Sequence, residues 1–297
     1  MGKRRFFIFL YALTPTLLWL GIQVVLSAGY GIFWLLLSGP AQMYPAVAAA
    51  MDYLEKEGLY ILSILMDLIF LVPGAFWFLH LLGGGRRKKE EAGAADPESY
   101  AGTARQSCER AGSTGRRKMA AADCISAVCL GLMMQVLGGI LLMLVAIAAP
   151  ELMEEYASVT EALGLGSPSV WSLVYGVLVA PVAEELIYRG LTMKIMERSF
   201  PFWAANLVQA ALFGLMHMNL VQSSYAFLMG LVLGAAAKKY GTLKGAVICH
   251  FAVNLSGNLI GYLPYPYLSR LVLLVLSGGI FLSLWYRERE ASQKNTF

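Results

Sequence analysis

Two adjacent glutamates and an arginine interrupt an otherwise apolar stretch of the chain. The sequence PVAEELIYRG at 181–190 places Glu184, Glu185 and Arg189 among leucine, valine and alanine. Glu185 and Arg189 are four residues apart, so on a helix they share one face and can form an ion pair. Glu184 is turned about 100° from Glu185 and has no cation on its own helix. A buried ion pair that only joins two helices therefore explains Glu185 and Arg189 but not Glu184.

Two of the three histidines also lie in apolar segments, each one helical turn from a residue that could shape a site. The sequence FGLMH ends at His217, and HFAVN begins at His250. Polar residues inside a membrane usually face the interior of a helix bundle or a water-filled cavity. We therefore expect six side chains to converge in one site: Glu184, Glu185, Arg189, His217, His250 and Asn254.

A carboxylate and two imidazoles around a water molecule are suited to hydrolysis. A glutamate removed from water is a competent base near neutral pH, and a histidine can hold the water or protonate a leaving amine. Asn254 and one imidazole could donate hydrogen bonds to the oxyanion of the attacked carbonyl. No serine or cysteine stands in a pattern that pairs it with a base, so we expect no covalent intermediate.

The same side chains could instead bind a divalent metal such as zinc, through two histidines and one glutamate with one position left for water. The single-helix zinc motif HExxH is absent from the sequence. The residues alone do not choose between a metal-free and a metal-dependent mechanism, and they indicate no other cofactor.

The elements that must position these residues are membrane helices. The chain of 297 residues is 58% hydrophobic and 14% charged, with a mean hydropathy of +0.62. Soluble domains contain about a quarter charged residues, and one span needs about 20 apolar residues. We predict an all-α, polytopic helix bundle with about eight transmembrane helices, near 6–28, 59–82, 123–149, 169–190, 203–219, 224–238, 244–262 and 267–286.

The sequence divides into three regions. Residues 1–82 are expected to form two transmembrane helices joined by an external segment, in which 40–58 could be a short interfacial helix. Residues 83–122 are rich in Gly, Ala, Arg and Ser and are typical of a basic, disordered cytoplasmic linker. Residues 123–290 form the transmembrane core, with the polar motifs within about 170–262.

The loop charges predict the orientation of the chain. Lys and Arg are concentrated in alternate loops, whereas the opposite loops are acidic, so both termini are expected in the cytoplasm. This topology leaves the relative depth of two site residues unresolved. Glu184 and His250 fall in the cytoplasmic half, whereas His217 falls nearer the outside unless the fourth span is extended or the turn after His217 is recessed.

The three motifs resemble the CPBP intramembrane proteases, also called the CaaX protease and bacteriocin-processing, or Abi, family. Its pattern of EExxxR, FxxxH and HxxxN on successive helices matches EELIYR, FGLMH and HFAVN here, in the same order. The resemblance implies an intramembrane endopeptidase in a prokaryotic plasma membrane, with a membrane-associated peptide or protein as substrate. It implies CaaX-type processing, peptide maturation or bacteriocin self-immunity as its use.

The resemblance also implies a role for each site residue. Glu184 would be the general base, and His217 would hold the water. His250 and Asn254 would stabilise the oxyanion, while Glu185 and Arg189 would organise the site. Members of this family are often labelled metal-dependent, but a metal-free glutamate mechanism has been argued for those that act on prenylated proteins.

Two other functions fit a polar pocket in a membrane. A non-catalytic binding or immunity protein could use the pocket to hold a peptide, and it would tolerate Glu184→Gln. A proton-coupled transporter also uses intramembrane Glu and His residues, although the chain lacks the internal repeat common in transporters. The lipid bilayer is an expected partner in each case, and the basic loops are read as topology signals, not as a nucleic-acid site.

Overall fold

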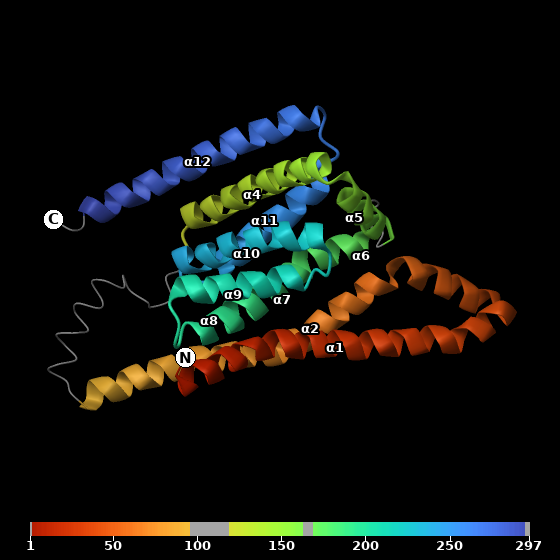
Figure 1. The fold of residues 1–297 in the computed structure, drawn as a ribbon, viewed down its shortest axis with the longest axis horizontal. Helices are drawn as coiled ribbons and strands as arrows, with labels where there is room; N and C mark the ends of the chain where they lie inside the picture. Colours follow the sequence, from red (N-terminus) through yellow and green to blue (C-terminus); the bar gives the residue numbers. More distant parts are fainter. Residues whose placement is uncertain (1, 96–118, 163–168, 295–297) are drawn as a thin grey trace.

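The protein is helical throughout the part of the chain that the structure, a computed structural model, describes: residues 2–95, 119–162 and 169–294 (Figure 1). Outside the fourth span, the helices are α1 (Lys3–Met43), α2 (Pro45–Ala95), α4 (Ala121–Ala148), α5 (Pro150–Ala162), α9 (Phe202–Leu215), α10 (Leu220–Tyr240), α11 (Leu243–Ile260) and α12 (Pro266–Lys294). The fourth span comprises α6 (Val170–Leu173), η1 (Val174–Val179), α7 (Ala180–Glu185), η2 (Leu186–Thr192) and α8 (Met193–Met196).

Within the described residues, seven helices are long and apolar enough to cross a membrane, and α9 is a shorter apolar helix. The predicted class, an all-α membrane bundle with about eight spans, is therefore confirmed. In Figure 1 the start of α1 and the end of α12 lie at the same end of the bundle. An even number of crossings produces this arrangement.

The fourth span changes its helical geometry around the glutamates. It is continuous from Val170 to Met196, but two π-helical segments, η1 and η2, flank the α-helical stretch α7. Pro181 lies in α7 and has no N–H, so it cannot make the regular backbone hydrogen bond. Such π-helical turns are frequent at functional sites because they redirect the side chains that follow.

The external segment expected at 40–58 is not a separate interfacial helix. The chain breaks only at Tyr44, whose extended backbone separates α1 from α2, so the segment forms the facing ends of two long helices. In Figure 1 these ends form the tip of a hairpin that projects beyond the other helices. Tyr30 in α1 stabilises the hairpin by donating a hydrogen bond to the Leu54 carbonyl at 2.9 Å.

Helices occupy both ends of the segment 83–122, which is expected to be a linker. Helix α2 continues to Ala95 and α4 begins at Ala121, because Lys, Glu and Ala are good helix formers even in water. The rest of the expected linker, 96–118, lies outside the described residues.

Close packing of α9 on α10 builds one wall of the bundle interior. A Cβ atom added at Gly230 would lie 2.9 Å from Cα of Ala210, and one added at Gly214 would lie 2.7 Å from the Ser223 carbonyl oxygen. Helix α11 packs against α4 on the opposite side. The fourth span contacts α9, α10 and α11, which places its two glutamates inside the bundle.

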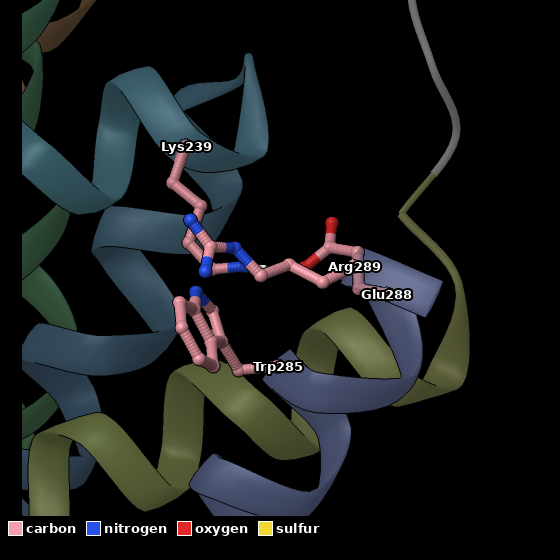
Figure 2. Close-up of a pocket in the computed structure, with 4 residues that line it drawn as sticks. All are labelled: Lys239, Trp285, Glu288 and Arg289. Carbon is pink, nitrogen blue, oxygen red and sulfur yellow. Dashed lines mark hydrogen bonds and ion pairs between the residues drawn. The ribbon is translucent and has the colours of Figure 1, made fainter. Parts of the chain in front are cut away.

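Helix α12 is joined to α10 by an ion pair at their C-terminal ends. Lys239 Nζ lies 2.7 Å from Glu288 Oε2, and the guanidinium carbon of Arg289 lies 4.5 Å from the centre of the Trp285 ring. These four residues line an open recess of about 290 Å³ (Figure 2). The recess contains none of the six predicted site residues.

Candidate active site

Three segments bring the six predicted residues toward one region. Glu184 and Glu185 end α7 and Arg189 lies in η2, while His250 and Asn254 lie in α11. His217 follows the end of α9, in the turn before α10. Glu185 and Arg189 are fully buried, whereas 15% of the Glu184 side-chain surface is accessible. The two glutamates therefore differ in exposure: Glu185 is enclosed by protein, and Glu184 is partly accessible.

Glu185 and Arg189 form the buried ion pair that their spacing predicts. Nη1 of Arg189 donates to Oε1 of Glu185 at 2.7 Å, and Nη2 donates to the Gly230 carbonyl at 3.2 Å. The guanidinium also lies over the Phe213 ring, 4.6 Å from its centre. Arg189 thus joins the fourth span to both α9 and α10.

His250 connects the two glutamates. Its Nδ1–H donates to Oε1 of Glu185 at 2.9 Å, and its Nε2 faces Oε2 of Glu184 at 3.6 Å. Because a carboxylate can only accept, the contact with Glu185 places the imidazole proton on Nδ1. Nε2 then faces Glu184, and it can donate a hydrogen bond there only if it also carries a proton.

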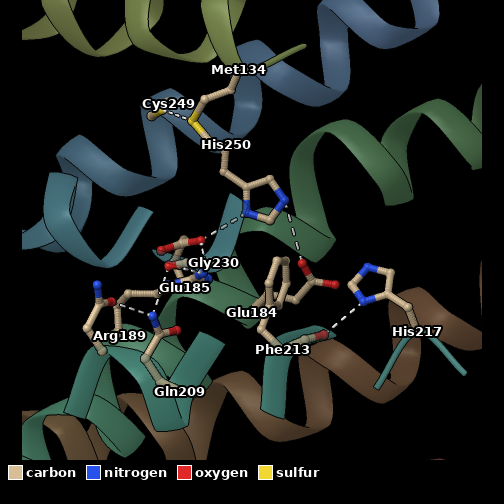
Figure 3. A network of polar contacts seen from close by, with 11 residues as sticks. Met134, Glu184, Glu185, Arg189, Gln209, Phe213, His217, Gly230, Cys249 and His250 are labelled. Atoms are coloured by element: carbon tan, nitrogen blue, oxygen red, sulfur yellow. Dashed lines mark hydrogen bonds and ion pairs between the residues drawn. The ribbon is translucent and has the colours of Figure 1, made fainter. Parts of the chain in front are cut away.

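His217 lies on the other side of the Glu184 carboxylate in Figure 3. Its Nδ1–H donates to the Phe213 carbonyl at 2.9 Å, so its Nε2 is the free acceptor. The Phe213 ring makes edge-to-face contacts with both imidazoles, with centres 5.1 Å from His217 and 5.8 Å from His250. Phe213 therefore sets the spacing of the two histidines.

Two local features, the long fourth span and the turn after α9, determine the depth of His217, which the sequence left unresolved. The fourth span continues as far as Met196, beyond its predicted end at 190, and α9 begins only at Phe202. After α9 ends, Met218 adopts a positive φ of 56°, and the Asn219 side chain accepts hydrogen bonds from the N–H groups of Val221 and Gln222 at the start of α10. This turn keeps His217 beside Phe213.

Asn254 is held by a backbone group of the fourth span. Its Nδ2 donates to the Gly176 carbonyl at 2.7 Å, and Gly176 belongs to the π-helical segment η1. An amide nitrogen has two N–H groups, so one remains for another acceptor. Among the described residues, Asn254 makes no hydrogen bond with Glu184, Glu185 or either imidazole.

The donor types present would suit zinc, since both histidines have Nδ1 bonded to an acceptor and Nε2 available, as metal-binding histidines commonly do. The positions of these side chains fit a metal site less well than their donor types do. Across the three described ranges, no three His, Cys, Asp or Glu side chains form a group that could hold a metal ion. The side chains alone can still supply a base, a water-holding group and hydrogen-bond donors.

Two buried polar residues near the site were missed in the sequence. Gln209 in α9 is fully buried and donates to the Gly230 carbonyl at 2.8 Å. Asp67 in α2 is 1% exposed and accepts a hydrogen bond from Trp19 Nε1 at 2.8 Å; it is close enough to interact electrostatically with Glu184. The signal for both is the one that identified Glu184, a polar residue within an apolar segment.

Comparison with known proteins identifies the same part of the chain. Residues 166–256 match a family model described as "Rce1-like: Type II CAAX prenyl endopeptidase Rce1-like". All three motifs lie within the match, and the predicted resemblance to the CPBP proteases is confirmed there. No curated protein and no solved structure matches the chain.

Proposed function

We propose that the protein is an intramembrane endopeptidase that hydrolyses a peptide bond with a water molecule activated by Glu184. The observation that carries this proposal is the arrangement around that carboxylate. His250 Nε2 faces Glu184 at 3.6 Å while Glu185 orients the other nitrogen of the same ring. Glu184 itself is partly accessible, and within the part of the chain that the structure describes it forms no ion pair with a cation of its own span, since Arg189 pairs with Glu185. The family match, to a group of endopeptidases, supports the same class of reaction.

The reaction would begin with a water molecule between Glu184 and His217. The water oxygen attacks the carbonyl carbon of the scissile peptide bond, and one water proton passes to the Glu184 carboxylate. His217 can orient this water, because its Nδ1–H is bonded to Phe213 and its Nε2 accepts a hydrogen bond. The carbonyl electrons move to oxygen and form an oxyanion.

The oxyanion would be stabilised by His250 and Asn254. His250 can donate from Nε2 when that atom is protonated, because Nδ1 is already bonded to Glu185. Asn254 can donate through the amide N–H that is not bonded to Gly176. Glu184 then gives its proton to the departing nitrogen, the C–N bond breaks and the carbonyl re-forms. The products are a carboxylic acid and an amine, with no covalent enzyme intermediate.

We propose a membrane-associated peptide or protein as the substrate, because the reactive groups lie within membrane helices. The name of the matching family makes a prenylated CaaX sequence the first substrate to test. Peptide maturation and bacteriocin self-immunity are the other uses that the CPBP resemblance implies. We place the protein in a prokaryotic plasma membrane with both termini in the cytoplasm.

The direct test uses purified protein in detergent and an internally quenched, farnesylated peptide that ends in a CaaX sequence. Peptidomics of membranes containing wild type or Glu184→Gln is run in parallel, to detect cleavage of other substrates. We expect new peptides only with wild type. Identical peptide patterns for the two proteins, with no cleavage of the probe, would overturn the protease proposal.

The same assay tests a metal. We expect turnover to persist after treatment with 1,10-phenanthroline, because the proposed steps use only protein side chains. Loss of turnover that added zinc restores would show a metal-dependent reaction instead.

A further inference from the structure

The carbonyl of Gly230 accepts hydrogen bonds from two side chains that belong to different helices. Nη2 of Arg189 donates to it at 3.2 Å and Nε2 of Gln209 donates to it at 2.8 Å (Figure 3). A carbonyl oxygen has two lone pairs, and in a helix one normally accepts from the backbone. Two further donors on one helical carbonyl make it a fixed junction of the fourth span, α9 and α10.

Gln209 is oriented by its surroundings and not by solvent. Its side chain is fully buried, and Nε2 also donates to Oδ1 of Asn206 at 2.7 Å. Both neighbours of Nε2 are acceptors, so the amide has only one satisfactory orientation. Both of its protons are therefore used in these two contacts.

Glycine residues of α10 create the room for this junction. A Cβ atom added at Gly234 would lie 2.8 Å from Nε2 of Gln209, and one added at Gly230 would lie 3.0 Å from Cβ of Ala210. Larger residues at these positions would separate α9 from α10. The close approach allows a glutamine of ordinary length to reach the backbone of the next helix.

The junction lies at one end of a continuous series of contacts to the proposed base. Arg189 connects Gly230 to Glu185, Glu185 connects to His250, and His250 faces Glu184. Gln209 also precedes Phe213 by four residues and His217 by eight. The three side chains therefore lie along one face of α9 and the turn that follows it. The guanidinium of Arg189 rests on Phe213, directly beside this face.

We propose that Gln209 is a positioning residue for the hydrolysis, which rests on the endopeptidase function proposed above. It holds the Gly230 carbonyl where Arg189 can bond it, so that Arg189 fixes Glu185 and Glu185 orients the His250 ring toward Glu184. Gln209 does not touch the reacting atoms. Its effect passes through Arg189.

Gln209→Met tests this role, because methionine has a similar length and no hydrogen-bond donor. Tyr240→Phe is the matched control, since it removes a buried hydrogen bond between α10 and α4, from the Tyr240 hydroxyl to Ser126 Oγ at 2.9 Å, that does not involve Gln209, Arg189 or the Gly230 carbonyl. We expect Gln209→Met to lower kcat on the farnesylated peptide by on the order of 10-fold to 100-fold with KM unchanged, as small displacements of catalytic groups do. Tyr240→Phe should keep kcat close to wild type.

Coupling to Arg189 separates this role from a general packing role. In an Arg189→Lys background, Gln209→Met should cause much less than its full loss of kcat, because the two changes interrupt the same path. Gln209→Ala is made alongside, in case the methionine variant folds poorly. Independent, multiplicative losses, or equal losses from Gln209→Met and Tyr240→Phe, would overturn the proposal.

A second measurement needs no turnover, so it distinguishes failure of this proposal from failure of the protease function. The chain has only three histidines, and ¹⁵N-histidine labelling in detergent gives a spectrum that His80→Gln and His217→Ala can assign. Gln209→Met should shift the His250 ring signals, whereas Tyr240→Phe should not. Unchanged His250 signals in a folded Gln209→Met protein would contradict the positioning role even if wild type cleaves no probe.

Discussion

His250 and Glu185, which are 65 residues apart in the chain, are joined by a buried hydrogen bond of 2.9 Å between Nδ1 and Oε1. The same carboxylate oxygen accepts a hydrogen bond from Arg189 at 2.7 Å. Glu185 therefore accepts hydrogen bonds from the arginine of its own span and from the histidine of another helix. This shared oxygen leaves Glu184, the adjacent residue, as the glutamate available for chemistry.

Glu184→Gln should fold normally and lose nearly all peptide cleavage. Glutamine keeps the volume of the side chain but cannot take the proton of the attacking water, and loss of one general base commonly costs about 10²–10⁴ in rate. Cleavage is measured with the farnesylated probe and folding by size-exclusion profile. A non-catalytic binding protein would keep its phenotype in this variant, so full function in well-folded Glu184→Gln would contradict the assignment.

Arg189→Ala should lower both the yield of folded protein and its activity. The change leaves Glu185 as a buried carboxylate without its cation, and breaking a buried pair in this way typically costs about 3–5 kcal/mol. Thermal unfolding in detergent measures the loss. Lys194→Ala is the control, because Lys194 makes a partly exposed ion pair with Glu197 at 3.3 Å, and such a pair contributes about 1 kcal/mol at most. Equal unfolding temperatures for Arg189→Ala and wild type would show that the pair is not buried.

Gly230→Ala should destabilise the protein through the contact between α9 and α10. The added methyl group would lie 2.9 Å from Cα of Ala210, and overpacking of this kind costs about 1–3 kcal/mol. Gly279→Ala in α12 is the control, since an added Cβ there meets nothing within 4 Å. The unfolding temperature should fall for the first variant only.

The topology prediction concerns both sides of the membrane. Reporter tags at Lys3, within 83–122 and at Phe297 should all report the cytoplasm, because Lys and Arg predominate in these loops. A tag near Glu154 in α5 should report the outside. A cytoplasmic signal at Glu154 together with one at Lys3 would contradict the predicted crossings of the first three spans.

Much of the site was predictable because its residues are costly in a membrane. A charged residue at the centre of a span costs about 2.5–3.5 kcal/mol on translocon scales, so Glu184, Glu185 and Arg189 stood out from their neighbours. Helical spacing then predicted the bond between Glu185 and Arg189. The number and class of the helices followed from apolar length in the same way.

Other features depended on contacts between helices that no local pattern encodes. Three contacts arise from how α9, α10 and α11 pack against the fourth span. They are the hydrogen bond of His250 to Glu185, the hydrogen bond of Asn254 to the Gly176 carbonyl, and the junction at the Gly230 carbonyl. The hydropathy pattern also did not predict that α1 and α2 extend as long helices through the external segment, because helices can continue beyond the apolar region in water.

The sequence by itself thus determined which side chains had to leave the lipid and which of them share a helix face, since both depend on residue type and on the helical repeat. Only the tertiary structure decided their partners. Close approach of α9 to the glycines of α10 brings Gln209 to a backbone carbonyl, and π-helical turns in the fourth span present a carbonyl to Asn254. Such distances are set by packing across segments far apart in the chain, which hydropathy and spacing do not specify.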